Sequence, residues 1–233
     1  MPEKIIVVTG CTRGIGRAVC DLFISKGFHI AGYARNVKDL EDMRAVYARD
    51  YPQQQVLLEQ ADATIKASVD KFAGNVVSKF GKVDILLNNA GYFLPGSIMK
   101  EPEGTLETMM ATNVYSAYHI TRALEGCVKQ HIVNMCSIAS LDAYEAGASY
   151  TISKFAMLGF SKQLRQELIA TGIKVTSILP GAVRTDSWKD VDLPASRFVQ
   201  AGDIAETIYT VCCSLSAGAD IEEIVIRPQQ GDI

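Results

Sequence analysis

A tyrosine and a lysine stand four positions apart in a stretch whose apolar pattern is typical of a helix, at Tyr150 and Lys154. Side chains at this spacing lie on the same face of a helix. A phenol ordinarily loses its proton near pH 10, and a nearby ammonium group favours the charged form. The pair could therefore exchange a proton with a substrate oxygen near neutral pH, although Tyr-x-x-x-Lys also occurs by chance.

Two further polar residues are candidates for the same site. Ser137 follows the apolar run 131–136, and Asn113 lies in apolar sequence that is typical of a helix. A serine after a strand is often only a cap, and an asparagine inside a helix is unfavourable because its amide competes for backbone hydrogen bonds. Their value as candidates depends on their occurring together with Tyr150 and Lys154.

A glycine-rich turn, TGCTRGIG, occupies residues 9–16 after the first apolar run. Gly10 allows a sharp turn, Gly14 allows close approach of a pyrophosphate to the backbone, and Gly16 allows close packing of helix on strand. No Gly-Lys-Ser/Thr follows, which excludes a nucleoside triphosphatase loop. A glycine-rich turn alone is weak evidence, but its place between a strand and an amphipathic helix predicts a dinucleotide site.

Charge favours NADPH over NADH. An acidic residue at the end of the second strand would accept hydrogen bonds from the ribose of NAD, whereas here Ala34 is followed by Arg35. Arg13 lies in the glycine-rich turn, and two guanidinium groups suit a 2′-phosphate. The alternative is that both arginines are simply solvated.

Short apolar runs alternate with longer amphipathic stretches along the whole chain, with no linker or repeat. Strands are expected at 4–9, 28–34, 56–59, 83–87, 131–136, 173–179 and 221–226, and helices at 14–27, 39–49, 65–80, 106–128, 149–171 and 204–214. This alternation predicts one α/β domain over residues 1–233: a doubly wound parallel sheet of about seven strands with helices on both faces. Ligands of such sheets bind beyond the carboxyl ends of the strands.

Composition excludes several other classes of protein. The 233 residues carry a net charge of -3 with no basic tract, so we expect the protein to bind neither nucleic acid nor an anionic membrane surface. No apolar run is long enough to span a membrane, and the amino-terminal residues do not resemble a signal peptide. Six cysteines without CxxC pairs or metal-ligand spacing predict reduced thiols, a cytoplasmic location and no metal.

Taken together, these motifs resemble the short-chain dehydrogenase/reductase family, in its branch of roughly this length. The resemblance covers nearly the whole chain and implies a Rossmann fold. It rests on the turn at 9–16, Asp62, Asn88-Asn89-Ala90-Gly91, Asn113, Ser137, Tyr150-x-x-x-Lys154, and Pro180-Gly181-x-Val183-x-Thr185.

The resemblance implies a role for each candidate. Tyr150 would be the general acid/base, Ser137 would polarise the substrate carbonyl, and Asn113 would help to hold a proton-relay water. Lys154 would bind the nicotinamide ribose and favour tyrosinate. The cofactor contacts expected from the turn, the charges and the resemblance are Gly10, Thr12, Arg13, Gly14, Ile15, Gly16, Arg35, Asp62, Asn89, Ala90, Gly91, Tyr150, Lys154, Pro180, Gly181, Val183 and Thr185.

We therefore expect an NADPH-dependent oxidoreductase that interconverts a carbonyl and a primary or secondary alcohol of a small molecule. One alternative is a 3-oxoacyl thioester reductase, and another is a non-catalytic NADP-binding regulatory protein. The chain is slightly short for the family, and the shortage falls at the substrate end, so residues 186–203 are expected to form a short substrate lid. The family's subunit interfaces imply a homodimer or homotetramer.

Overall fold

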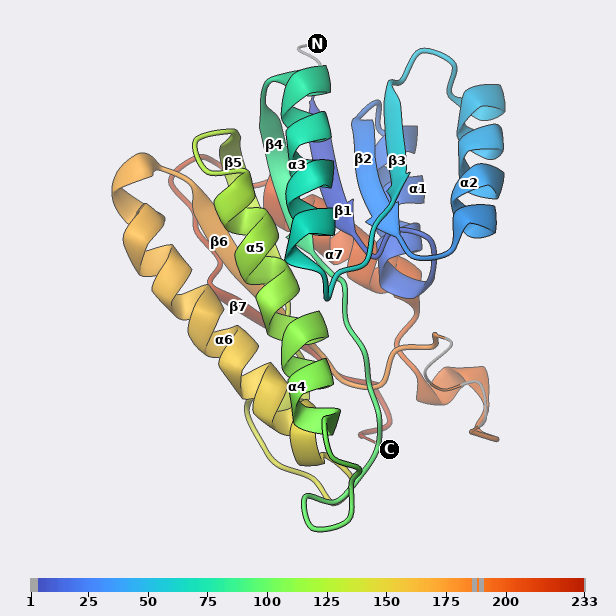
Figure 1. Ribbon diagram of the computed structural model, residues 1–233, viewed down its shortest axis with the longest axis vertical. Coiled ribbons are helices and arrows are strands. Elements are labelled where there is room, and N and C mark those ends of the chain that lie inside the picture. Colours follow the sequence, from blue (N-terminus) through green and yellow to red (C-terminus); the bar gives the residue numbers. More distant parts are fainter. Residues whose placement is uncertain (1–3, 186–187, 189–190, 233) are drawn as a thin grey trace.

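The computed structural model describes residues 4–185, 188 and 191–232 (Figure 1). Its strands are β1 (Ile5–Thr9), β2 (His29–Ala34), β3 (Val56–Gln60), β4 (Val83–Asn88), β5 (Val128–Met135), β6 (Lys174–Pro180) and β7 (Glu223–Ile226). Its α-helices are α1 (Gly14–Ser25), α2 (Val37–Asp50), α3 (Lys66–Phe80), α4 (Thr105–Met110), α5 (Ser116–Ala123), α6 (Ala148–Leu168) and α7 (Ala201–Cys213). A π-helical turn, Ala111–Tyr115, joins α4 to α5.

The strands form one parallel sheet in the order β3-β2-β1-β4-β5-β6-β7. Every residue of β1, β2 and β4 is buried, because helices cover both faces of the sheet. The strand order reverses between β1 and β4, and ligands of doubly wound sheets bind at such a point. The predicted Rossmann fold with about seven strands is confirmed.

Of the three hydrophobic clusters among the described residues, the two largest hold the layers together. One lies between the sheet and α1, α2 and α7, and the other lies between the sheet and α3, α5 and the carboxyl-terminal half of α6. Figure 1 shows α3, α5 and α6 on the near face of the sheet and α1 and α7 behind it. Burial of apolar surface on both faces is the main stabilisation of this arrangement.

The largest difference from the predicted elements lies between residues 106 and 131. The helix expected at 106–128 ends at Ala123, and β5 begins at Val128 rather than at 131. Gly126 lies between them with φ +72°, in the left-handed region that ends helices. Apolar residues continue through this turn, which is why the sequence pattern reads as one long helix.

Candidate active site

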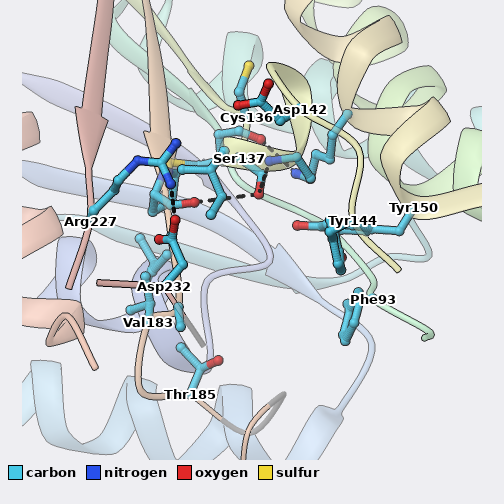
Figure 2. Close-up of a pocket in the computed structure, with 18 of the residues that line it drawn as sticks. Phe93, Cys136, Ser137, Asp142, Tyr144, Tyr150, Val183, Thr185, Arg227 and Asp232 are labelled. Carbon is cyan, nitrogen blue, oxygen red and sulfur yellow. Dashed lines mark hydrogen bonds and ion pairs between the residues drawn. The ribbon is translucent and has the colours of Figure 1, made fainter. Parts of the chain in front are cut away.

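A cavity of about 430 Å³ opens at the carboxyl ends of β5 and β6 (Figure 2). Tyr150 and Lys154 reach it from α6, and Ser137 reaches it from the segment after β5. Three of the four predicted catalytic side chains therefore line one space. The predicted segment 180–185 contributes Pro180, Gly181, Val183 and Thr185 to the same wall.

Lys154 lies next to the ring of Tyr150. It is buried, its Nζ donates a hydrogen bond to Met135 O at 2.8 Å, and it lies 5.6 Å from the centroid of the Tyr150 ring. Phe93 packs edge-on against that ring with centroids 4.9 Å apart. Because a buried ammonium with neutral partners keeps a strong field, it favours negative charge nearby.

Ser137 stands in extended backbone at the end of β5. Its Oγ accepts a hydrogen bond from Ala139 N at 3.1 Å and lies 3.5 Å from Pro180 O, the one acceptor it has among the described residues. A separation of 3.5 Å is at the limit for a hydroxyl donor, so this bond is weak. The hydroxyl can therefore turn to donate to a ligand oxygen in the cavity.

Asn113 lies behind the cavity rather than on its wall. Its Oδ1 accepts from Tyr92 N at 2.7 Å, and its Nδ2 donates to Tyr92 O at 3.0 Å and Ser153 Oγ at 2.9 Å. The residue sits in the π-helical turn, where the backbone widens, and π-turns recur at functional sites. A Cβ placed on Gly91 would lie 3.6 Å from Asn113 Oδ1 and 3.9 Å from Lys154 Nζ. The relay water assigned to Asn113 remains a prediction.

A second cleft of about 910 Å³ adjoins the first and shares Ile15, Asn89, Phe93 and Thr185 with it. Most of the predicted cofactor residues line this cleft: Gly10, Thr12, Arg13, Gly14, Ile15, Arg35, Asp62, Asn89, Ala90, Gly91 and Thr185. Gly16 lines neither. The two spaces form a continuous path from Arg35 and Asp62 to Tyr150.

The glycine-rich turn has the shape that a dinucleotide needs. Gly10 and Gly14 have φ of +67° and +53°, which other residues adopt only with strain. A Cβ on Gly16 would lie 2.2 Å from Gly10 O, so Gly16 is required for close packing of α1. No side chain caps the amino end of α1, so its first N–H groups can donate to phosphate oxygens.

Thr9 and Asn89 join the ends of β1 and β4 at the switch point. Thr9 Oγ1 accepts from Asn89 N at 2.9 Å and Ala90 N at 2.8 Å, and Asn89 Nδ2 donates to Thr9 O at 2.9 Å. These hydrogen bonds hold Asn89, which lines both cavities, in place. The sequence identified Asn89 and Ala90 through the resemblance alone.

The charged end of the second cleft holds Arg13, Arg35, Asp39 and Asp62. Arg13 Nε donates to Asp39 Oδ2 at 2.8 Å, although that side chain of Arg13 is 60% exposed. Hydrogen bonds from the Thr64 backbone and hydroxyl lower the pKa of Asp62, and the positive charge of Arg35 lowers it further. The sequence analysis missed Asp39, which could have been found as the residue capped by Asn36 at the start of α2.

The sequence analysis also missed three charged residues on the substrate side, Asp142, Arg227 and Asp232. Arg227 follows β7 at the carboxyl edge of the sheet, and its position after the last apolar run was an available signal.

Two further cavity residues, Cys136 and Tyr144, are uncharged at neutral pH. Burial raises the pKa of the Cys136 thiol to about 11 and also raises the pKa of Tyr144, so both remain protonated. Among the described residues, no group of three or more His, Cys, Asp or Glu side chains lies close enough together to hold a metal ion.

The predicted lid at 186–203 is described only in part, since residues 186–187 and 189–190 lie outside the described residues. Trp188 lines the cavity and packs on Phe198 with ring centroids 5.6 Å apart. Val199 forms a parallel bridge with Val183, which ties the end of this segment to the cavity wall.

Comparison with known proteins identifies the fold and the family. The family model for short chain dehydrogenases matches residues 4–195. The chain belongs to the short-chain dehydrogenase/reductase family. The sequence-based resemblance is thereby confirmed.

Several members of the family are similar over almost the full length. The chain is 31% identical over 230 residues to an uncharacterized oxidoreductase of Staphylococcus epidermidis, covering 97% of each chain. It is 33% identical over 222 residues to a 3-oxoacyl-[acyl-carrier-protein] reductase of Haemophilus influenzae, covering 89% of this chain and 90% of the relative. The structure of L-sorbose reductase from Gluconobacter frateurii, complexed with NADPH and L-sorbose, superposes with a TM-score of 0.89 at 25% identity, covering 97% of this chain and 95% of the other.

Proposed function

We propose that this short-chain dehydrogenase/reductase interconverts a carbonyl and a primary or secondary alcohol of a small molecule, with NADP(H) as cofactor and Tyr150 as general acid/base. One observation carries the proposal. Tyr150, Ser137 and Lys154 line a single cavity that continues into the cleft formed by the glycine-rich turn. A substrate oxygen and a nicotinamide ring could therefore meet at the shared residues.

The cofactor, when bound, supplies or accepts the hydride. The amino end of α1 would bind its diphosphate, as the uncapped N–H groups favour. Asp62 would meet the adenine edge, and Val183 and Thr185 would hold the nicotinamide amide. Lys154 would hold the nicotinamide ribose while it stays bonded to Met135 O.

The reacting oxygen would be held by two hydroxyl groups. Ser137 would turn from its long bond to Pro180 O and donate to the carbonyl oxygen, which polarises the carbonyl. The Tyr150 hydroxyl would give its proton to the same oxygen as the alcohol forms. The ammonium of Lys154 would stabilise the phenolate left behind, because charge stabilisation in a water-poor site is large. Asn113 would act from behind, through a proton-relay water.

The preference for NADP(H) is supported by Arg13 and Arg35 at the charged end of the second cleft. Guanidinium groups pair with phosphate dianions in a planar, bidentate geometry. The L-sorbose reductase of similar structure was solved with NADPH, which agrees with this preference.

The decisive test measures NADPH consumption by purified protein over a panel of aldehydes, ketones and 3-oxo acids. We expect reduction of some members, and a fall in kcat of about 100-fold or more in Tyr150→Phe, because a positioned acid contributes rate factors of this size. Tyr115→Phe removes the same atom from an exposed ring outside the cavity and should leave kcat unchanged. Unchanged reduction by Tyr150→Phe would refute the assignment.

A 3-oxoacyl thioester reductase is a second candidate, supported by the 33% identity to the Haemophilus influenzae enzyme. The net charge of -3 offers little attraction for an acidic carrier protein. Adding 3-oxoacyl thioesters to the panel separates the two. A kcat/KM for thioesters far above that for free ketones would favour this candidate.

A non-catalytic NADP-binding protein is the third possibility. It would bind NADPH and consume none with any carbonyl compound. The complete set of Tyr150, Ser137 and Lys154 in one cavity favours an enzyme, since binding alone does not need a proton donor.

A further inference from the structure

The wall of the substrate cavity opposite the tyrosine carries an arginine that the proposed reaction does not use. Arg227 comes directly after β7 and lines the cavity together with Asp232. Figure 2 shows Tyr144 and Tyr150 on one side of this space, Arg227 and Asp232 on the other, and Ser137 between them. The only other cation lining the cavity among the described residues is Lys154, which is already bonded to Met135 O.

The Arg227 guanidinium is already paired with a carboxylate. Its Nη1 forms an ion pair with Asp232 Oδ2, five residues further along the chain. This carboxylate is positioned by the carboxyl-terminal segment: Pro228 is buried, and Arg197 Nη2 donates to Asp232 O at 3.3 Å. A Cβ on Gly181 would lie 3.0 Å from Pro228 Cδ and 3.3 Å from Asp232 Oδ1, so the segment rests against the cavity wall.

The pair can exchange its carboxylate at little cost. Both side chains are 41% exposed, and ion pairs that exposed contribute little stability because water screens them. A carboxylate of a bound molecule could accept the hydrogen bond from Arg227 Nη1 that Asp232 Oδ2 accepts. We propose that Arg227 binds the carboxylate of the substrate, which would be an oxo acid or the corresponding hydroxy acid, and that Asp232 occupies this position when no substrate is bound.

The surroundings favour a monocarboxylate over a phosphate ester. Asp142 and Asp232 line the same cavity and would repel a dianion more strongly than a monoanion. Much of the remaining wall is apolar and aromatic and suits a short carbon chain: Phe93, Ile138, Ala139, Ala143, Tyr144, Ala182, Val183 and Trp188. The carbonyl would lie at Ser137 and Tyr150 and the carboxylate at Arg227, which sets the orientation of the molecule. This inference rests on the proposed function, because it names the substrate class of the same cavity.

Binding can be measured without turnover. Trp188 is the only tryptophan of the chain and lines the cavity, so its fluorescence reports ligands there. With saturating NADP⁺ we would titrate pentanoate and its neutral isostere pentanamide. We expect pentanoate to bind at least about tenfold more tightly, because charge-assisted hydrogen bonds are the stronger ones. Arg227→Gln should abolish this difference, and Asp232→Asn should tighten pentanoate binding several-fold by removing the internal competitor.

Arg184→Gln is the matched control. It removes the same charge from an exposed arginine next to Val183 that does not line the cavity, and the tenfold difference should persist. Equal binding of pentanoate and pentanamide to the unmodified protein would overturn the inference. So would equal losses of pentanoate affinity in Arg227→Gln and Arg184→Gln.

Turnover separates this inference from the proposed function. We would compare kcat/KM for 4-oxopentanoate and its methyl ester, expecting at least a tenfold preference for the acid that Arg227→Gln removes and Arg184→Gln keeps. Equal reduction of acid and ester, unaffected by Arg227→Gln, would leave the proposed function standing and overturn the inference. Pentanoate binding that depends on Arg227, without reduction of any carbonyl compound, would support the carboxylate site and contradict the proposed function.

Discussion

Arg13 and Asp39 form an ion pair at the end of the cleft where the adenosine ribose of a cofactor would lie. A 2′-phosphate would compete with Asp39 for the guanidinium and would be repelled by its carboxylate. We therefore expect the aspartate to lower the affinity for NADPH that Arg13 and Arg35 together would provide. On this proposal the net preference between the two cofactors depends on these three side chains.

This balance gives a prediction in two directions. Arg13→Gln should raise KM for NADPH by about tenfold, because hydrogen bonds to charged groups contribute about 1.5–3 kcal/mol, and should change KM for NADH little. Asp39→Asn should lower KM for NADPH and leave that for NADH nearly unchanged. Steady-state kinetics with both cofactors checks this. A clear preference of the unmodified enzyme for NADH would contradict the argument.

The placement of two candidate residues, though not their roles, follows from a strong local signal. The helical spacing of Tyr150 and Lys154 predicted a common face, and both side chains line the cavity. The contribution of Arg227 and Asp232 could not be predicted, because it depends on the carboxyl-terminal segment folding back on Gly181, a contact between residues far apart in sequence. Local patterns carry no information on such a contact.

Helix α6 carries the acid/base candidate and is anchored where it begins. Its second residue, Ser149, is buried, and its Oγ donates a hydrogen bond to Glu101 Oε1 in the loop after β4. The preceding Ala148 has φ +30°, which is strained for a residue with a Cβ. The hydrogen bond therefore holds the start of α6 in a conformation that it would otherwise avoid.

We expect Ser149→Ala and Glu101→Ala each to lower kcat by about tenfold, because a small displacement of Tyr150 slows proton transfer steeply. The double variant should be no slower than either single one, since all three lose the same hydrogen bond. Single-turnover kinetics measures the rate of the chemical step, and a binding titration with NADPH measures cofactor affinity separately. Additive losses in the double variant, or weaker NADPH binding in place of slower turnover, would show that the contact does not position Tyr150.

Element boundaries were the weaker part of the sequence analysis. The π-helical turn Ala111–Tyr115 and the end of α5 at Ala123 fall inside one predicted helix. Hydrophobic periodicity does not register a single wider turn, and the apolar residues of β5 continue the pattern after Gly126. The type and order of the elements were predicted, because they depend on the repeated alternation of strand and helix.

An exposed apolar face on α5, α6 and the π-helical turn bears on assembly. Tyr115, Tyr118, Ile152 and Phe155 are 51%, 42%, 41% and 47% exposed. Large exposed apolar side chains on neighbouring elements favour an interface with another protein chain. We propose a homodimer or homotetramer joined through this face, consistent with the interface expected from the family.

Among the described residues, no helix has the length and hydropathy to cross a membrane.

Light scattering tests the assembly. We expect a mass of two or four times 25.3 kDa, and a smaller species for Phe155→Glu, because an unpaired charge in an apolar interface is costly. Ile169→Glu changes an equally exposed residue beyond the end of α6 and should leave the mass unchanged. A stable monomer of the unmodified protein would contradict this proposal.

The stability of the whole chain should depend on pH through a buried histidine. Burial lowers the pKa of His131 to about 4, and its Nε2 lies 2.8 Å from Thr176 Oγ1. The folded state therefore binds this proton less readily than the unfolded chain does. The contribution of His131 to the free energy of unfolding is therefore complete above pH 6.5. It falls by about 3 kcal/mol in all as the pH drops toward 4.

Urea unfolding at pH 7.5 and pH 4.5 measures this dependence. His131→Gln should lose part of the difference between the two pH values, whereas the carboxylates contribute equally to both proteins. His119→Gln is the matched control for loss of an imidazole. An identical pH dependence in the unmodified protein and His131→Gln would show that the histidine does not contribute.

The two ends of the described chain lie on opposite edges of the sheet (Figure 1). Lys4 precedes β1 at the edge away from the cavity, whereas Asp232 is part of the cavity wall. Asp232 is also paired with Arg227, so we expect a purification tag on its carboxyl-terminal side to weaken the carboxylate binding proposed for Arg227 without altering any catalytic side chain. A tag on the amino-terminal side of Lys4 should leave that binding intact.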